Sequence, residues 1–562
     1  MIKLKNLLIE GSKENAALDY LQQLVRNGPF KGRVYLAGGA VRDMELGKDP
    51  KDLDVVVTGG IDAGMEFAKW ATQTMRNYRE GSNPVLFPTY GTAKFTLKGI
   101  VHDGIDLSDV DIEAVATRKE KYTAGSRKPE VSAGDLGDDV NRRDFTVNSL
   151  LKDLTTGEIL DLTGKGKEDI RRGVIQTPLN PDIIFSEDPL RMLRAVRFTM
   201  KYDWELPMFM IKALKRNAEQ LTNISQERIR DELNKMLVTG SPERAIKLLK
   251  VTGLLKYVIP EFLPAVRMTQ NVHHKRDVFG HTLDVLKGTD SVLLQRLMAL
   301  FHDIGKTVTR SVTPTGVHFY GHEDAGADMT KVIMHRLKYP SDIIDAVVLG
   351  VRNHMKLKHG GDDAVRLTDK TLRKFKIALG DKLEDTLNVI HADNTAHSEA
   401  SSMPNQIANV RARLKSLDAS TPSSPKLPIN GGDLIALGIK PGPIFSKILS
   451  AVTEKWYENP AISKKDALHI VKSIINSQSK SLLPESVDIK WIVGYVDAYG
   501  KVHYKVVRRN DSIDSHNAIW PGPKHGKWRW VPSDPNHLNT YSEELDGDDE
   551  DAIWRIIDRF RD

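Results

Sequence analysis

The sequence contains no cysteine among its 562 residues. Disulfides and thiolate metal sites are therefore excluded, and any metal must be held by Asp, Glu, His or water. Long apolar runs are also missing, since stretches such as Val55–Val57 and Leu297–Phe301 fall far short of the roughly 20 residues that cross a bilayer. Residues 1–15 lack the apolar core of a secretory signal. We therefore expect a cytoplasmic protein that does not insert into membranes.

An excess of basic charge is present but small. The net charge is +6 and the pI is near 9.0, which is compatible with a phosphate-rich partner but is weak evidence over so long a chain. The composition, 40% hydrophobic and 28% charged, is that of an ordinary globular protein. The length predicts about three or four domains.

A glycine pair and two aspartates follow one another near the start of the chain. An apolar segment runs into Gly38-Gly39, where the backbone can approach a ligand closely and a helix start favours a triphosphate. Arg42 follows as a second phosphate donor. Asp52 and Asp54 stand at the entry to an apolar strand, and residues i and i+2 of a strand project to the same side. Nucleotidyl transfer needs such a pair to hold two metal ions, and Mg²⁺ prefers these oxygen ligands.

These motifs resemble the class II tRNA nucleotidyltransferases (CCA-adding enzymes), which share their head with bacterial poly(A) polymerases. The resemblance implies that Asp52 and Asp54 bind the catalytic Mg²⁺ and that Gly39 and Arg42 contact the incoming nucleotide. A third carboxylate is expected from Asp111 or Glu113, and the sequence does not decide between them. Residues 142–149 (RRDFTVNS) resemble the family's ribose- and triphosphate-recognising segment, which implies nucleotide binding by Arg143.

A charged helix follows at residues 187–198. Asp188, Arg191 and Arg194 are spaced by three and are predicted to share one helical stripe. Asp only accepts hydrogen bonds and Arg only donates them. Cytosine and adenine both present an amino donor beside a ring-nitrogen acceptor, whereas uracil and guanine reverse the two. An Asp188–Arg191 pair therefore selects C and A without a template. The resemblance implies this role, with Arg194 and Arg197 also binding the nucleotide. We interpret the later helical segment, residues 227–233, as mainly structural.

A second group of residues, made up of His281, His302-Asp303, His322, His354 and Asp393, suits another metal site. Its ordered series resembles the HD phosphohydrolase superfamily, which implies one or two divalent metals, and imidazole with carboxylate suits Ni²⁺, Mn²⁺ or Fe²⁺. A bound metal activates water against a phosphoester. Some CCA-adding enzymes carry this domain, which implies phosphatase or 2′,3′-cyclic phosphodiesterase activity. The alternative is a retained fold that only supports tRNA. The ligands implied are His281, His302, Asp303, His322, His354 and Asp393.

The expected fold class is α+β. It combines a nucleotidyltransferase head with a mixed or antiparallel sheet, a mostly helical body with an all-helical HD domain, and a small β-rich C-terminal module. Strands are expected at residues 34–37, 53–58, 93–97 and 110–117. The predicted parts are an N-terminal extension (1–30), the head (31–160), a helical nucleotide- and tRNA-binding body (161–265), the HD-like domain (266–415), a linker with a helical segment (416–478), and a Trp-rich module without an assigned function (479–562).

We expect template-independent addition of C-C-A to tRNA 3′ ends from CTP and ATP. A poly(A) polymerase shares every catalytic residue, and CCA addition is favoured because the HD domain accompanies that activity in the resemblance. An alternative of another class is an HD phosphohydrolase whose head binds nucleotide without catalysis. The number of subunits stays open.

Overall fold

The computed structural model describes residues 2–76, 83–121, 130–270, 275–418 and 426–481, and the strands 489–496, 502–508 and 529–532. The chain divides into two compact units, Met1–Ala419 and Ser420–Asp562. Each unit is described by itself.

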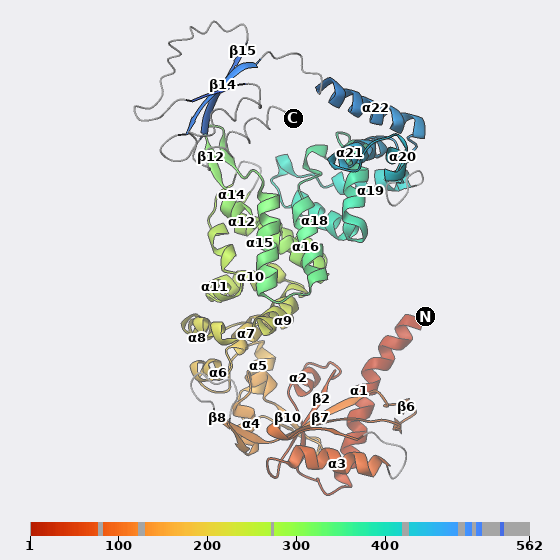
Figure 1. Ribbon diagram of the computed structural model, residues 1–562. Coiled ribbons are helices and arrows are strands. Elements are labelled where there is room, and N and C mark those ends of the chain that lie inside the picture. The colour runs from red at the N-terminus through yellow and green to blue at the C-terminus, as the bar shows by residue number, and fades with distance from the viewer. Residues whose placement is uncertain are drawn as a thin grey trace. The chain divides into compact units, whose positions relative to one another are not determined.

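A seven-stranded sheet in the order β11-β10-β1-β2-β7-β4-β3 organises the head (Figure 1). β2 and β7 run parallel, whereas the other neighbours are antiparallel. The predicted mixed sheet is confirmed, and the four expected strands match β1, β2, β4 and β7 to within one residue. The strands are β1 (Val34–Ala37), β2 (Leu53–Val57), β3 (Val85–Phe87), β4 (Thr92–Thr96), β7 (Asp111–Ala116), β10 (Leu151–Asp153) and β11 (Ile159–Leu160).

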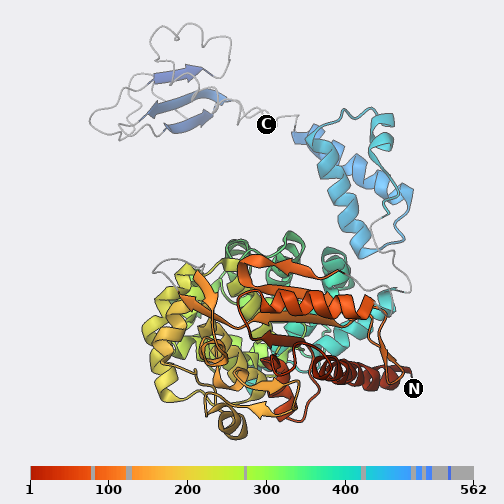
Figure 2. The same cartoon turned by 90° about the horizontal axis from the view of Figure 1, so that it is seen from below.

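Two long helices pack against the head. α1 (Ile2–Arg26) presents Ala17, Leu18, Leu21 and Val25 to the core, at the three-to-four spacing of one helix face. α3 (Ala63–Arg76) packs on β4 and β7 (Figure 2). The head also contains two short hairpins, β5–β6 (Val101–His102, Ile105–Asp106) and β8–β9 (Arg118–Lys121, Glu130–Ala133), and the helix α4 (Leu136–Asn141).

Beyond the head, the part of the first unit that the structure describes is mainly helical, with a hairpin β12–β13 (Ser311–Thr313, Gly316–His318). A continuous hydrophobic core extends from Ala17 in α1 to Ala392 in α18. The head, the helical body and part of the HD region therefore share one interior. The helices that follow the head are α5 (Gly166–Arg172), α6 (Pro181–Glu187), α7 (Leu190–Tyr202), α8 (Met208–Asn217), α9 (Gln226–Leu237), α10 (Pro242–Val251), α11 (Leu255–Val258), α12 (Val278–Gly288), α13 (Leu293–Phe301), α14 (Lys306–Thr309), α15 (His322–Arg336), α16 (Ser341–Asn353), α17 (Asp369–Leu379), α18 (Leu383–Thr395) and α19 (Gln406–Asp418).

Within its described residues, the second unit has three helices and three strands. α20 (Gly431–Ala436), α21 (Pro443–Glu458) and α22 (Lys464–Ser481) enclose a small apolar core. The helical segment predicted within 416–478 is present, and its last helix, α22, continues to Ser481. An antiparallel sheet of β14 (Ile489–Val496), β15 (Val502–Arg508) and β16 (Arg529–Pro532) agrees with the predicted β-rich module. Trp520, Trp528 and Trp554 of the Trp-rich module lie outside the described residues.

Across the ranges that the structure describes, no helix combines the length and the apolar character needed to span a bilayer.

Candidate active sites

The two predicted catalytic aspartates line the same cavity. Asp52 directly precedes β2 and Asp54 lies within it, and both line a cavity of about 600 Å³ on the β1 side of β2. Desolvation, followed by repulsion from Glu113 and Asp52, raises the pKa of Asp54 to about 6, although Arg143 opposes the rise. Because repulsion between carboxylates contributes to this raised pKa, a bound cation would be stabilised here.

Glu113 is the third carboxylate of this group. It lies opposite Asp54 in the parallel register of β2 and β7. Asp111, the other candidate, is instead engaged by Lys94 Nζ at 2.8 Å and by Thr96 Oγ1 at 2.7 Å. The geometry therefore favours Glu113 as the partner of the aspartate pair.

The glycine pair makes room for two guanidinium groups. Gly38 has a φ of +71°, and a Cβ there would stand 3.3 Å from Arg143, while one on Gly39 would stand 3.3 Å from Arg42. Arg42 is buried in the cavity wall and donates to Asp43 at 2.8 and 2.9 Å and to Asn148 Oδ1 at 2.5 Å. The close approach of these side chains to the backbone explains the two glycines.

Asp139 anchors the arginine pair, a role that the motif did not reveal. It is fully buried and accepts from Arg142 at 2.5 Å and from Arg143 at 2.8 Å. Burial alone would raise the pKa of Asp139, but the two guanidinium groups outweigh it and hold the pKa below its usual value. Arg143 is thereby held in the wall of the cavity.

Asp188 and Arg191 both line the same cavity as the aspartate pair, but they do not contact one another as an ion pair. The prediction that Asp188 lies on the helical stripe is wrong in detail, because α7 begins at Leu190 and Asp188 lies between α6 and α7. Its Oδ1 accepts from the Leu190 N–H at 3.1 Å and its Oδ2 from Arg228 Nη2 at 2.8 Å. The interpretation of residues 227–233 as mainly structural is therefore incomplete, since Arg228 is part of the cavity wall.

Arg191 is oriented by backbone and side-chain acceptors. Its Nη1 donates to the Ile184 carbonyl at 3.1 Å and to Glu187 at 2.7 Å, and its Nη2 donates to the Arg142 carbonyl at 2.6 Å. These three bonds leave its Nε–H and one Nη2–H for a ligand, since a guanidinium has five N–H groups.

The remaining two arginines of α7 also face the cavity, each held by a buried acid. Arg194 donates to Asp144 at 2.6 and 2.8 Å, and Arg197 donates to Glu232 at 2.6 Å. Guanidinium groups paired with buried acids are fixed in direction, which suits the recognition of an anionic ligand.

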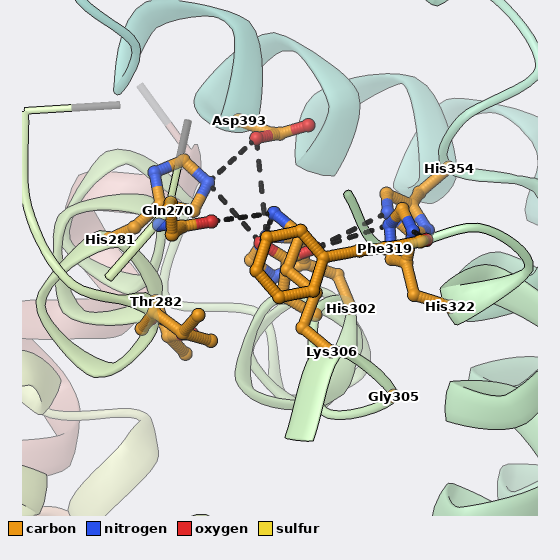
Figure 3. A network of polar contacts seen from close by, with 12 residues as sticks. Gln270, His281, Thr282, His302, Gly305, Lys306, Phe319, His322, His354 and Asp393 are labelled. Atoms are coloured by element: carbon orange, nitrogen blue, oxygen red, sulfur yellow. Dashed lines mark hydrogen bonds and ion pairs between the residues drawn. The ribbon is translucent and has the colours of Figure 1, made fainter. Parts of the chain in front are cut away.

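The six residues predicted for the HD site converge in the helical region (Figure 3). Asp303 lies at the centre. Its Oδ2 is 3.6 Å from His281 Nε2 and 3.3 Å from His302 Nε2, while its Oδ1 is 3.4 Å from His322 Nε2 and 3.8 Å from His354 Nε2. Asp393 Oδ1 lies 3.0 Å from His281 Nε2. Two groups of ligands therefore share one bridging carboxylate.

Three of these histidines are oriented in the same way. The Nδ1 atoms of His302, His322 and His354 each lie within 2.6–2.8 Å of the backbone carbonyl three residues earlier, so each Nδ1–H donates. Their Nε2 atoms are buried and have no hydrogen-bond partner. A buried nitrogen without a partner is costly, and a metal ion is the ligand that an imidazole lone pair of this kind prefers. The donor set therefore fits one or two divalent ions.

Two lysines balance the buried carboxylates. Lys306 Nζ lies 2.7 Å from Asp303 and 2.8 Å from Gln270 Oε1, and Lys358 Nζ lies 2.7 Å from Asp393. Burial opposes ionisation of both aspartates, yet the lysines and the neighbouring imidazoles hold their pKa values well below the usual range. Both acids are therefore charged and ready to bind a cation.

His397 belongs to this cluster although the ordered series did not include it. It joins His281 and Asp393 as a possible ligand group. Its Nδ1–H donates to the Asp393 carbonyl at 2.6 Å. Burial lowers the pKa of His397 to about 4, so the ring is neutral at pH 7.

Three family models match the chain in succession. Residues 34–176 match the poly A polymerase head domain, residues 210–266 the probable RNA and SrmB-binding site of polymerase A, and residues 278–386 the HD domain. The first covers the aspartates and arginines of the head, and the third covers every predicted HD ligand except Asp393.

The chain is also similar to named proteins. It is 29% identical over 448 residues to the CC-adding tRNA nucleotidyltransferase of Thermus thermophilus, covering 77% of this chain and 92% of that protein. It is 32% identical over 336 residues to the A-adding tRNA nucleotidyltransferase of Deinococcus radiodurans, covering 57% and 75%. It is 28% identical over 387 residues to the multifunctional CCA protein of Neisseria meningitidis, covering 65% and 85%.

The fold is similar to that of the Bacillus stearothermophilus CCA-adding enzyme crystallised with CTP. The TM-score is 0.56 at 22% identity, over 84% of this chain and 99% of that one. Given the order of the three family models, and the A-adding relative matched at 32% identity over 75% of its length, the chain belongs to the class II tRNA nucleotidyltransferases and carries an HD domain.

Proposed function

We propose that the head adds C, C and A in turn to the 3′ end of tRNA, using CTP and ATP. The observation that carries this proposal is that Asp52 and Asp54 line the same cavity as Asp188 and Arg191. The groups for transfer and the groups for base selection therefore face one bound nucleotide.

Base selection follows from the directions of the two side chains. Arg191 keeps N–H groups for a ring-nitrogen acceptor, and Asp188, fixed by Arg228, keeps lone pairs for an amino donor. Cytosine and adenine match this pattern, whereas uracil and guanine leave polar groups unpaired at about 1–3 kcal/mol each. Nothing in this pair distinguishes C from A, which favours addition of both.

We propose Mg²⁺ as the ion of the head. Asp52 and Asp54, with Glu113 on the neighbouring strand, offer only oxygen ligands. These three carboxylates would hold such ions, which would supply activation of the attacking 3′-hydroxyl and charge neutralisation for the leaving pyrophosphate. Arg143 lies beside Gly38 and Arg42 lies beside Gly39, and all four residues line the nucleotide cavity. We expect the two arginines to bind the triphosphate. We expect this reaction in the cytoplasm.

Nucleotide incorporation tests this function. A tRNA without CCA and a tRNA ending in CC are incubated with CTP, with ATP or with both. We expect two C additions from CTP on the first tRNA and one A from ATP on the second, all lost in Asp54→Ala. Long A tails from ATP alone would instead assign a poly(A) polymerase, and success on only one of the two tRNAs would restrict the enzyme to CC or A addition.

We propose that the HD domain is a metal-dependent phosphohydrolase acting on phosphomonoesters or 2′,3′-cyclic phosphates. This proposal is supported by the buried set of ligands, in which the Nε2 atoms of His302, His322 and His354 have no hydrogen-bond partner. Imidazole with carboxylate favours Ni²⁺, Mn²⁺ or Fe²⁺. The test is hydrolysis of p-nitrophenyl phosphate and 2′,3′-cyclic AMP after chelation and reloading with each metal. We expect Asp303→Ala to abolish hydrolysis and preserve CTP incorporation. Hydrolysis without any incorporation by the wild type would favour an HD phosphohydrolase with an inactive head, and no hydrolysis with any metal would leave the domain a supporting fold.

A further inference from the structure

A second cavity, of about 480 Å³, shares Lys51, Asp52 and Asp54 with the nucleotide cavity. The two cavities open on different sides of the strand that carries the aspartates. The nucleotide cavity takes its walls from residues after β1 and from α7, whereas the second takes them from β4, from β7 and from α1. Because β2 stands between β1 and β7 in the sheet, the aspartate pair separates the two spaces.

The N-terminal helix α1 supplies one wall of the second cavity. Lys13 and Glu14 line it, and they continue by one turn the stripe of Ala17 and Leu18 with which α1 packs on the core. Asn15 Nδ2 also donates to Asp49 Oδ1 at 2.5 Å. The helix therefore reaches both the cavity and the loop that leads into Asp52.

Two of the three lysines that line this cavity form ion pairs with carboxylates that solvent reaches. Lys13 pairs with Asp109, whose side chain is 77% exposed, and Lys94 pairs with Asp111 at 2.8 Å. Exposed ion pairs contribute little to stability and exchange readily. Both ammonium groups are thus positioned in the cavity and available to a stronger anion.

The geometry of nucleotidyl transfer indicates which part of the substrate enters the second cavity. In nucleotidyl transfer the attacking hydroxyl approaches the α-phosphate in line with the leaving pyrophosphate and from the opposite side. The proposed contacts with Arg42 and Arg143 would put the triphosphate on the β1 side of the aspartates. The acceptor hydroxyl must then arrive from the β7 side, where the second cavity opens.

We propose that this cavity seats the 3′-terminal nucleotide of the acceptor RNA, with Lys13 of α1 and Lys94 of β4 contacting its backbone phosphates. The proposal rests on the proposed function of the head. It gives the N-terminal helix a part in substrate binding, although residues 2–26 precede the stretch that matches the head model. Phosphate contacts of this kind position an RNA without reading its sequence.

The test compares Lys13→Ala and Lys94→Ala with Lys69→Ala, an exposed lysine of α3 that lines neither cavity. We expect each of the first two variants to raise the KM for tRNA about fivefold and to weaken its salt dependence, because each removes about one phosphate contact. The KM for CTP should stay within about twofold of wild type, as a contact on the acceptor side predicts. Lys13→Arg should restore most of the tRNA affinity.

Asp109→Ala separates RNA binding from a structural role. If Lys13 served only to pair with Asp109, both variants would show the same defect, and that result would overturn the proposal. We expect Asp109→Ala to leave the KM for tRNA unchanged or lower it. An unchanged KM for tRNA in both lysine variants, or an effect on CTP alone, would equally overturn it.

The proposed function can fail separately. If the wild type adds no nucleotide to any tRNA, the function is wrong, and the cavity is then tested by fluorescence anisotropy with a 5′-labelled RNA minihelix and no nucleotide. About fivefold weaker binding by Lys13→Ala than by Lys69→Ala supports the acceptor cavity, since one phosphate contact is lost. Equal binding refutes it.

Discussion

Glu113 lies beside Asp54 because β2 and β7 run parallel with these two residues in register. The pairing brings two like charges together at the catalytic edge and contributes to the raised pKa of Asp54. A metal-free head is therefore under electrostatic strain at this point, and a bound cation relieves it.

Asp54→Asn should stabilise the metal-free protein above pH 6 and leave it unchanged near pH 4. The folded-state pKa of Asp54 is about 6, above the reference value of 3.8, so ionisation disfavours the folded state at higher pH but not below the reference value. Because the carboxylate reaches solvent, we expect only about 1 kcal/mol. Thermal unfolding with chelator at pH 4 and pH 7.5 measures this difference.

Asp111→Asn is the matched control for that experiment. Its hydrogen bond from Lys94 lowers the pKa of Asp111, so the sign is reversed and the variant should lose a little stability at pH 7.5. If Asp54→Asn stabilised the protein equally at both pH values, ionisation of Asp54 beside Glu113 and Asp52 would not destabilise the folded state.

Asp188→Ala should lower kcat/KM for CTP and ATP by about 10- to 100-fold and reduce discrimination against UTP, since one base contact is worth about 1–3 kcal/mol. Arg228→Ala should lower kcat/KM for CTP and ATP by a smaller factor, because the Asp188 carboxylate is no longer oriented by Arg228. Steady-state incorporation with each nucleotide measures both. A loss that is equal for all four nucleotides would argue against base selection by Asp188.

Asp139→Ala should destabilise the fold by about 3–5 kcal/mol, because it leaves two guanidinium groups without their buried partner. The neighbouring Asp138→Ala removes an exposed pair with Lys119 and a helix-capping contact, and should cost about 1 kcal/mol or less. Urea unfolding followed by circular dichroism compares the two. Similar losses would mean that Arg142 and Arg143 find other acceptors.

His322→Ala and His281→Ala should each remove one of two metal ions from the HD site, because they lie on different oxygens of Asp303. Asp303→Asn should remove both, and the exposed His335→Ala on α15 should remove neither. Elemental analysis after loading with Mn²⁺ or Ni²⁺ counts the ions. A single ion in the wild type, lost in every ligand variant, would contradict the two-ion arrangement.

The sequence predicted the features that depend on neighbouring residues. The strand that ends at Gly38-Gly39 and the strand behind Asp52 follow from local apolar runs, and both are present. The HD ligands stand at or near helix ends, where a short motif such as His302-Asp303 keeps its geometry wherever the helices pack.

Features that depend on distant contacts could not be predicted. Arg228 meets Asp188 across 40 positions of chain, and nothing in a helical charge pattern signals this. Asp139 resembles a surface acid until the fold buries it beneath two arginines. The choice of Glu113 over Asp111 depends on the register of two strands, which alternation alone leaves open.

The shared core from Ala17 to Ala392 joins the head, the helical body and part of the HD region. Side chains such as Leu249 of α10 and Val285 of α12 complete one interior, so a cut between the body and the HD helices would expose apolar surface on both fragments. The helices that share this core should therefore unfold together, and neither the body nor these HD helices should keep its packing once the other is removed.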